Sequence, residues 1–523
     1  MSPSPAAWSR RLAQPATAFV AATLTAVSAG CGAGGDESAD PAKVAPARSA
    51  VYVVATMRPD GDQKEAVDQI GRKVFRVSDT GKRLQQLVDR WFNQHRATRN
   101  VTYTDDVEPW LGRRAAVAIT RLGGGGQTKV AIFAAKDTGK AKRFVDKVGD
   151  DASPRWPKRS YRGVDYRFDP SDASGQGVVD DYLVAGDEAA LKAVIDAFRN
   201  GRGLGDDPRY RNVAAGAEGK LAFGYVDVRA ATAGLGTARV LPAGVLQSLA
   251  GETSPTQPVT FSLSVRPDRV TVDTVARGVS ATRPADRTSP LVARLPGDSW
   301  LAVGLARVGQ SLHGALRQLG RGATEALIGP LRRTLRTRTG LDLDRDVLAA
   351  IGDVALFARG STLRTVGGGL VVATRDPAAA RRLVARLRAV VRREAAHGAR
   401  TADASIAGAH GFRVAAGQLP GTVDVVVKGD RLVAAYGDAA TREALSATSP
   451  LAGAPDYRAA QESLDGAPPA VFVAFAPVAA LVGTRTGTGA QQASAYLSAL
   501  RTLAVGSRAE SDRRTSRLVV TLR

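Results

Sequence analysis

Short apolar runs recur along the chain between polar breaks. Runs rich in Val, Ala and Leu are bounded by Gly, Pro, Asp or Asn, which is typical of β-strands. The segments 271–276 and 517–522 alternate in part between apolar and polar residues, as half-buried strands do. The glycine-rich segment 121–129 indicates a hairpin loop, and hairpins join antiparallel strands.

Between these runs, other segments carry apolar residues at helical spacing. In the segment 376–395, one arc of the predicted helix is apolar and every arginine lies outside that arc. The arc contains Ala380, Leu383, Val384, Leu387 and Val391, and the arginines are Arg381, Arg382, Arg386, Arg388, Arg392 and Arg393. We therefore predict an α+β fold, in which mixed or mostly antiparallel sheets carry helices packed on one face.

The same series of segments occurs twice, in the same order. The matched pairs are 50–58 with 299–307, 106–119 with 346–358, 130–148 with 370–387, 181–196 with 431–447, and 207–231 with 454–480. Each series closes with two short apolar runs. A long internal match of this kind predicts two tandem homologous units, over residues 49–285 and 286–523.

Composition adds a strong positive charge to this picture. The 523 residues are 44% hydrophobic and 23% charged, which is typical of a globular protein, and the formal net charge is +22. Such an excess is compatible with a nucleic-acid partner, with an anionic membrane or wall surface, or with the composition of a GC-rich genome. We favour the compositional interpretation because Ala, Gly and Arg dominate the whole chain.

The N-terminus has the pattern of an export signal. Residues 1–30 combine Arg10 and Arg11 with a short apolar run and end in small residues before Cys31. This predicts a signal peptide over 1–30 and lipidation of Cys31, although Ser28 stands where a lipobox usually has Leu. Cleavage without lipidation and an uncleaved anchor are the alternatives.

The segment 31–48 is rich in Gly, Asp, Ser and Pro and predicts a flexible tether. We expect the body of the protein to lie outside the cytoplasm, anchored to the outer face of the membrane or else secreted. That location argues against a nucleic-acid partner.

Residues that carry chemistry are sparse. The chain has one cysteine and four separated histidines, and it lacks the spaced His and Cys pairs of zinc sites, so no metal site or cofactor is expected from them. No sequence pattern of a catalytic nucleophile and base occurs, so no catalytic residue is predicted. Asp60, Asp62 and the group Asp105, Asp106 and Glu108 would bind a hard cation if their loops met; turn and capping roles are the simpler interpretation.

The stretch DDVEPWLGRR, residues 105–114, differs between the two predicted units. The shared pattern predicts a short helix capped by Thr104 and ended by a left-handed Gly112. Unit 2 replaces Glu108, Pro109 and Trp110 with Leu348, Ala349 and Ala350. Trp110 and Glu108 are therefore the candidate contact residues for a partner of the first unit.

Several of these segments resemble a known family. The residues YVVATMRPDGDQKEAV (52–67), DVEPWLGRRAAVAI (106–119), LGDDPRYRNV (204–213) and LAFGYVD (221–227) resemble an exported actinobacterial family, domain of unknown function 3352. The resemblance implies export and an actinobacterial source. It implies no activity, substrate or cofactor.

These observations favour a non-catalytic binding or scaffold protein of the cell envelope. An anionic lipid or a wall polymer is the partner that the charge suggests. The alternative is a carrier for an apolar or lipid ligand, held in a cavity between sheet and helices. An enzyme is the third and least favoured hypothesis.

Overall fold

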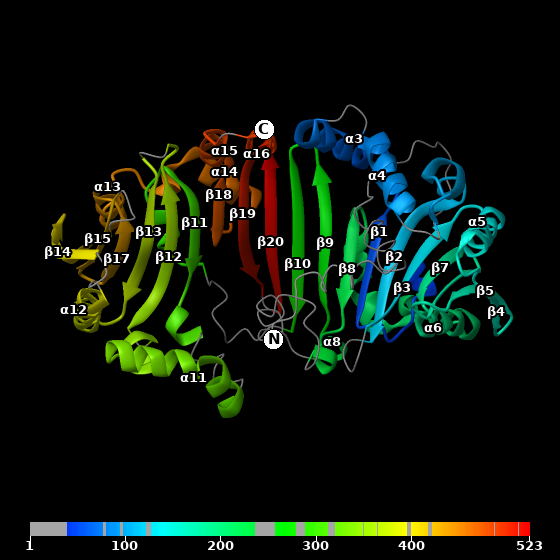
Figure 1. The fold of residues 1–523 in the computed structure, drawn as a ribbon, viewed down its shortest axis with the longest axis horizontal. Coiled ribbons are helices and arrows are strands. Elements are labelled where there is room, and N and C mark those ends of the chain that lie inside the picture. Colours follow the sequence, from blue (N-terminus) through cyan, green and yellow to red (C-terminus); the bar gives the residue numbers. More distant parts are fainter. Residues whose placement is uncertain are drawn as a thin grey trace. The chain divides into compact units, whose positions relative to one another are not determined.

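The computed structural model describes residues 39–523 except 77–79, 95–97, 122–126, 236–256, 279–287, 312–319, 349, 363–364, 395–398, 417–420, 486 and 511. The predicted signal peptide, Cys31 and the first part of the predicted tether lie outside these residues. The described chain is α+β with antiparallel sheet, as predicted (Figure 1). It divides into two compact units, unit 1 (residues 1–280 and 511–515) and unit 2 (281–510 and 516–523).

The sheet of unit 1 is built from ten described strands. They are β1 (Val51–Thr56), β2 (Leu111–Arg121), β3 (Thr128–Ala135), β4 (Lys158–Tyr161), β5 (Val164–Asp169), β6 (Ser174–Val179), β7 (Tyr182–Asp187), β8 (Ala222–Val226), β9 (Val259–Arg266) and β10 (Arg269–Arg277). Neighbouring strands follow the order β4-β5-β6-β7-β3-β2-β1-β8-β9-β10, and every one of these pairings is antiparallel.

Helices and short turns connect these strands. The α-helices are α3 (Gly61–Ile70), α4 (Thr80–Gln94), α5 (Thr138–Asp151), α6 (Glu188–Asn200), α7 (Pro208–Ala214) and α8 (Val228–Leu235). The short helical turns are η1 (Pro41–Lys43), η2 (Gly71–Phe75), η4 (Tyr103–Val107), η5 (Leu204–Asp206) and η6 (Ala215–Ala217).

Unit 2 also has ten described strands. They are β11 (Ser299–Leu305), β12 (Ile351–Arg359), β13 (Gly367–Thr374), β14 (Ala399–Ile406), β15 (Ala409–Ala416), β16 (Thr422–Lys428), β17 (Arg431–Tyr436), β18 (Val471–Ala474), β19 (Leu500–Ala509) and β20 (Arg513–Leu522). Their order is β14-β15-β16-β17-β13-β12-β11-β18-β19-β20, which is the order of unit 1 strand for strand.

The connections of unit 2 are again helical. Its α-helices are α11 (Gly320–Thr339), α12 (Pro377–Glu394), α13 (Asp438–Leu445), α14 (Pro455–Ser463), α15 (Phe475–Gly483) and α16 (Thr488–Ala499). Its short helical turns are η7 (Val292–Arg294), η8 (Leu343–Leu348) and η10 (Leu451–Gly453).

Helices cover both faces of each sheet, so the prediction of helices on one face is wrong. On β3, Val130 and Ile132 share a core with residues of α6, whereas Phe133 shares a core with residues of α5. Alternate residues of a strand point to opposite faces, so α5 and α6 lie on opposite sides. On β17, Val433 packs with α13 and Leu432 with α12 in the same way. A strand buried on both faces is apolar without alternation, which explains the continuous runs in the sequence.

The second half of the predicted tether belongs to the folded core of unit 1. Asp40 caps η1 by accepting a hydrogen bond from the N–H of Ala42 at 3.1 Å, and Ala42 and Ala45 are fully buried. The carbonyl of Ala45 accepts from the N–H of Leu204 at 2.8 Å. The prediction is therefore wrong for residues 39–48, because small residues that resemble a linker fit closely against a neighbouring segment.

A segment of unit 2 makes the matching contacts. The N–H of Leu451 donates to the carbonyl of Leu295 at 2.8 Å, as Leu204 does to Ala45. The bridge between Pro296 and Pro450 likewise corresponds to the bridge between Pro46 and Gly203. The folded part of each unit thus begins before its first strand.

The turn before β2 also differs from its prediction. Thr102, not Thr104, caps η4: its Oγ1 accepts from the N–H of Asp105 at 3.3 Å, while the carboxylate of Asp106 accepts from the N–H of Thr102 at 2.9 Å. Gly112 lies inside β2 and does not have a positive φ angle. A Cβ on Gly112 would lie 2.8 Å from the carbonyl oxygen of Ala134, so the close approach of β3 requires glycine there.

The same constraint holds in unit 2, where a Cβ on Gly352 would lie 2.7 Å from the carbonyl oxygen of Ala373. We expect Gly112→Ala and Gly352→Ala each to lower the free energy of unfolding by about 1–3 kcal/mol, because backbone must move to admit the methyl group. Urea denaturation of the full chain measures this change. Gly489→Ala in α16 is the control, since nothing lies within 4 Å of its Cβ position and a small gain is expected. Equal stability of all three variants would contradict the close-approach argument.

Candidate functional site

Trp110 is a core residue, which corrects its prediction as a contact residue. Its exposed fraction is 0%, and its ring lies 5.4 Å from the ring of Phe144 and 6.3 Å from that of Phe133. Its Nε1–H donates to the carbonyl of Asp106 at 2.7 Å, so the polar end of the indole is satisfied as well. No face of this ring is available to a partner.

Glu108 is partly buried, and about a quarter of its side-chain surface is exposed. Its carboxylate pairs with the guanidinium of Arg58 at 3.2 Å, and the carbonyl of Glu108 accepts from the same guanidinium at 3.3 Å. These contacts join the end of β1 to the turn before β2. A partner contact through Glu108 stays a prediction.

The carboxylates considered for a cation site have other partners. Asp60 pairs with Arg113 at 2.5 Å, and Asp106 pairs with Lys147 at 2.6 Å. Asp105 accepts from the hydroxyl of Thr102 at 3.0 Å. Within the described ranges, no cluster of three or more His, Cys, Asp or Glu residues has the arrangement to hold a metal ion. Asp105 and Asp106 thus have turn roles in η4, whereas the side chain of Asp60 pairs with Arg113 and does not cap α3.

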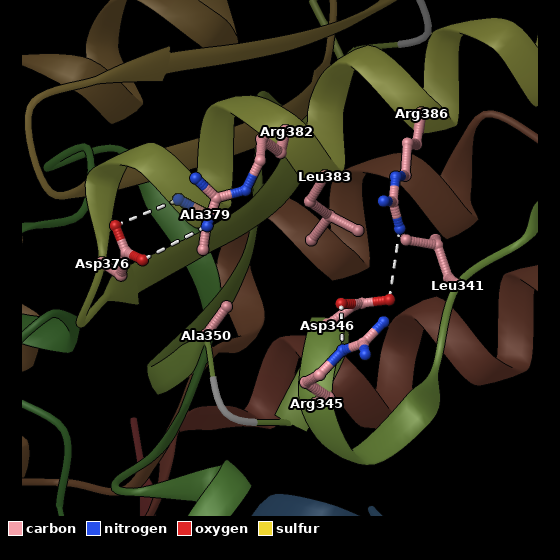
Figure 2. Close-up of a pocket in the computed structure, with 9 residues that line it drawn as sticks. All are labelled: Leu341, Arg345, Asp346, Ala350, Asp376, Ala379, Arg382, Leu383 and Arg386. Atoms are coloured by element: carbon pink, nitrogen blue, oxygen red, sulfur yellow. Dashed lines mark hydrogen bonds and ion pairs between the residues drawn. The ribbon is translucent and has the colours of Figure 1, made fainter.

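A cavity of about 270 Å³ lies at the start of α12 in unit 2 (Figure 2). We call it the arginine pocket. It is lined by Leu341, Arg345, Asp346, Ala350, Asp376, Ala379, Arg382, Leu383 and Arg386. Leu341 precedes η8, Arg345 and Asp346 lie on η8, and Ala350 precedes β12. The other residues are Asp376, just before α12, and side chains of the first turns of α12.

Local capping brings these segments into place. Asp342 accepts from the N–H of Arg345 at 3.0 Å and thereby caps η8, and Asp346 accepts from the N–H of Asp342 at 2.9 Å. At the start of α12, Asp376 accepts from the N–H groups of Ala378 at 2.8 Å and Ala379 at 3.0 Å. Caps of this kind satisfy the first N–H groups of a helix. The pocket lies between two capped helical starts.

The two carboxylates of the pocket stay ionised near neutral pH. The N–H of Asp342, and then the guanidinium of Arg345, hold the pKa of Asp346 below its ordinary value. The N–H groups of Ala379 and Ala378, followed by the charge of Arg382, lower the pKa of Asp376 in the same way. A hydrogen bond or positive charge that favours the ionised form lowers a carboxyl pKa.

The cations of the pocket exceed its anions by one. Asp346 accepts from Nε of Arg345 and from a guanidinium nitrogen of Arg386, both at 3.2 Å. Arg382 approaches Asp376 only at 3.5 Å, and its side chain is 65% exposed. Figure 2 shows Arg345 and Arg386 pointing toward Asp346 from opposite sides. Three guanidiniums thus face two carboxylates, and the group with the weakest pairing is Arg382.

Apolar side chains form part of the lining of the arginine pocket, which we call its floor. Leu341 and Ala350 are buried, and Leu383 is partly buried against the core that α12 covers. The titratable side chains of the lining are three arginines and two aspartates. The arrangement therefore suits binding of an anion with a small apolar part, because guanidinium groups donate paired hydrogen bonds to carboxylate and phosphate.

The corresponding place in unit 1 is filled by Trp110. The N–H of Lys136 donates to the carbonyl of Trp110 at 2.8 Å, and the N–H of Arg375 donates to that of Ala350 at 3.3 Å. Trp110 and Ala350 therefore hold equivalent positions before their strands. The bulky Trp110 side chain is absent at Ala350, so space remains beside α12.

The ion pairs around these two positions also correspond. Asp106 pairs with Lys147 of α5, as Asp346 pairs with Arg386 of α12. The sequence predicts a contact role for Trp110, but Trp110 is buried, and the cavity lies at Ala350 of unit 2. The loss of a large side chain at Ala350 was the available signal.

Two other cavities are described, both in unit 1. One of about 830 Å³ is lined by acidic and basic side chains in near balance: Asp60, Asp62, Glu65, Arg113, Arg114, Lys220 and Arg266. The other, about 460 Å³, surrounds Arg167, whose buried guanidinium is paired with Asp146 at 2.8 Å and Asp150 at 2.7 Å. Each of these cavities also has one more cationic than acidic side chain, so an excess of one charge does not set the arginine pocket apart. What sets it apart is its position beside Ala350, where unit 1 has Trp110.

Comparison with known proteins identifies a family model that covers almost the whole chain. Residues 16–523 match the model described as "Protein of unknown function (DUF3352)". No curated protein matches the chain. No helix in the described part of the chain has both the length and the apolar character needed to cross a membrane.

Similar solved structures include two crystal forms of TP0453. Form I covers 47% of this chain and 82% of that chain, with 9% sequence identity and a TM-score of 0.25. Form III covers 46% and 81%, with 9% identity and a TM-score of 0.27. Similarity at this level supports no statement about function.

We expect Trp110→Ala to lower the free energy of unfolding by about 3–5 kcal/mol, because it removes a fully buried ring and leaves a cavity. Urea denaturation followed by circular dichroism measures the loss. Leu87→Ala is the control: that side chain is 47% exposed, so a change within about 0.5 kcal/mol is expected. An unaltered unfolding midpoint for Trp110→Ala would show that the ring does not stabilise the core.

Proposed function

The chain belongs to the DUF3352 family, and we propose that it is an exported envelope protein that binds an anionic partner without catalysing a reaction. The observation that carries this proposal is the exposed arginine face of α12. We define the arginine face as Arg381, Arg382, Arg386, Arg392 and Arg393, all of which are exposed. The anionic partner is a lipid surface or a wall polymer of the envelope.

The opposite side of α12 fixes this face in place. Ala380 and Val384 are buried in a core with Phe412 and Leu432, and Leu383, Leu387 and Val391 pack against it. The helix is therefore held by its apolar arc, and the arginine face points away from that arc. A basic side chain near an anionic membrane contributes about 1 kcal/mol of attraction.

The arginines of α12 outnumber the carboxylates around them. The helix has six arginines and one glutamate, and Asp376, Asp346 and Asp403 pair with Arg382, Arg386 and Arg388 from neighbouring segments. In unit 1 the charges of the equivalent helix α5 nearly cancel, because Lys140, Lys142, Arg143 and Lys147 are accompanied by Asp146, Asp150 and Asp151. The proposed attraction therefore belongs to unit 2.

The location of the protein is part of the proposal. A signal peptide over 1–30 and a lipid on Cys31 would place both units on the outer face of the membrane, close to anionic lipids and polymers. Secretion after cleavage is the alternative. Nucleic acid is not the proposed partner, because such a location separates the protein from it.

The cavities favour binding of anions over carriage of an apolar ligand. Each of the three described cavities is lined by charged side chains. A carrier site would be mostly apolar. We propose binding without catalysis because the two carboxylates of the arginine pocket are already engaged, Asp346 with two arginines and Asp376 with helix N–H groups.

Duplication is the proposed origin of the two units. It is supported by the shared strand order and by equivalent ring pairs: Tyr210 and Phe223 lie 6.5 Å apart in an edge-on arrangement, and Tyr457 and Phe472 lie 5.4 Å apart in a similar one. After duplication, one unit would retain Trp110 in the core while the other acquired Ala350 and a pocket.

We expect the exported protein to carry a lipid on Cys31. Mass spectrometry of the N-terminal peptide, isolated from membranes of the producing cells, tests this. The expected peptide begins at Cys31 and has the added mass of a lipid. Cys31→Ser is the control and should be recovered in the soluble fraction. An N-terminal peptide with an unmodified thiol on Cys31 would disprove the anchor and leave secretion as the route.

We expect the Cys31→Ala chain, which cannot be lipidated, to float with vesicles containing phosphatidylglycerol and not with vesicles of phosphatidylcholine alone. Arg381→Glu with Arg392→Glu should weaken this binding by about tenfold or more, because two attractions become repulsions. High salt should weaken it as well, since exposed charges are screened.

The matched control reverses two charges of unit 1. Lys140→Glu with Lys142→Glu on α5 alters the net charge by the same amount, so its binding should fall by much less if the arginine face is the contact. Equal losses in the two double variants would show that only net charge matters. A wild-type chain that binds neither anionic vesicles nor anionic wall polymer would refute the proposed function.

A further inference from the structure

We propose that the arginine pocket of unit 2 is a binding site for a singly charged phosphodiester with a small apolar neighbour. The inference rests on the proposed function and names the chemistry that unit 2 recognises. Such a group occurs both in the headgroup of an anionic phospholipid and along a phosphodiester wall polymer. Attraction by the arginine face is general, whereas the pocket selects a particular group.

The charge of the pocket matches a single negative charge. Asp346 already occupies two of the guanidiniums, those of Arg345 and Arg386. Arg382 has only the longer contact with Asp376. A phosphodiester carries one charge and completes the pairing, whereas a dianion would leave an unmatched charge next to Asp346.

The positions of the arginines suit a phosphate group. Arg382 and Arg386 extend from successive turns of α12, and Arg345 lies on η8 across the pocket (Figure 2). Asp346 accepts from Arg345 and Arg386, so both guanidiniums lie near the pocket but compete for the same carboxylate charge. The contacts would come from these side chains and not from the helix end, since Asp376 already satisfies the N–H groups of Ala378 and Ala379.

The floor of the pocket selects for a ligand that is not wholly polar. Leu341, Ala350 and Leu383 are the apolar members of the lining, and Leu383 is the most accessible of the three. A volume of about 270 Å³ is at the lower end of ligand sites, so it admits a headgroup and not a lipid chain. The apolar part of an ester would displace water from the apolar lining, which a bare phosphate ion would not do, so the ester should bind more tightly.

Ala350→Trp is the variant that tests the pocket most directly. Because Trp110 occupies the equivalent position in unit 1, Ala350→Trp should fill the pocket with a side chain that this fold already accommodates. The variant leaves every arginine in place. It therefore separates binding in the pocket from attraction by the arginine face.

The experiment is calorimetric titration of the full Cys31→Ala chain at low salt. The probes are glycerophosphoglycerol, monomeric dihexanoylphosphatidylglycerol and inorganic phosphate. We expect saturable binding of the two phosphodiesters at one site and at least about tenfold weaker binding to Ala350→Trp. Circular dichroism and the unfolding midpoint of Ala350→Trp verify that it is folded.

Two further variants keep the test decisive if Ala350→Trp does not fold. Arg382→Ala should weaken binding by about tenfold, and Arg442→Ala, an exposed arginine on α13, should not change it. Asp346→Asn retains an acceptor for the N–H of Asp342 but removes a charge, so binding should strengthen by about fivefold. If the probe does not bind in the pocket, Arg382→Ala should not weaken its binding and Asp346→Asn should not strengthen it.

The three probes separate the sources of the ligand. Tighter binding of the short-chain lipid than of glycerophosphoglycerol supports a lipid headgroup, and equal binding of the two supports the phosphodiester unit alone, as in a polymer. Inorganic phosphate that binds as tightly as the diesters would overturn the proposed selectivity. Undiminished diester binding by both Ala350→Trp and Arg382→Ala would overturn the site itself, while vesicle binding through the arginine face would leave the proposed function standing.

Discussion

Burial of the central strands on both faces is the constraint on which each unit depends. Val130 and Ile132 of β3 contribute to one core and Phe133 to another, and Val433 and Leu432 of β17 divide in the same manner. Each face must then be covered by a helix whose own apolar arc matches it. The helix that covers a face presents its other side to solvent. The charged surface of α12 thus follows from the requirement to bury the strands beneath it.

A single aspartate connects this architecture to the pocket. Asp346 accepts from the N–H of Asp342 to close the turn η8, and it also pairs with Arg386 of α12. Asp106 has the same two roles in unit 1, through Thr102 and Lys147. This shared arrangement stabilises both units, and the side chain at Trp110 or Ala350 determines whether a cavity forms beside it. With Trp110 the space is core, and with Ala350 it is a cavity.

Much of the fold was predictable from sequence, because helical spacing and apolar runs directly reflect burial. The helix predicted over 376–395 is α12, Pro377–Glu394, with its arginines outside the apolar core. Other features depend on contacts between distant residues. The fit of Ala45 against Leu204, the approach of Ala134 to Gly112 and the burial of Trp110 leave no local pattern. The candidate site could not be predicted for the same reason, because the pocket exists where Ala350 has no large side chain to fill the space.

The early entry of the chain into the core of unit 1 also bears on the proposed lipid anchor. The first residues packed there are near Asp40 and Ala42, so a lipid on Cys31 would be joined to the folded body by residues 32–38 alone. An extended chain spans at most about 3.6 Å per residue, so this seven-residue segment can span no more than about 25 Å. A body held so near the bilayer would encounter membrane headgroups and the innermost wall polymers far more often than distant layers of the envelope.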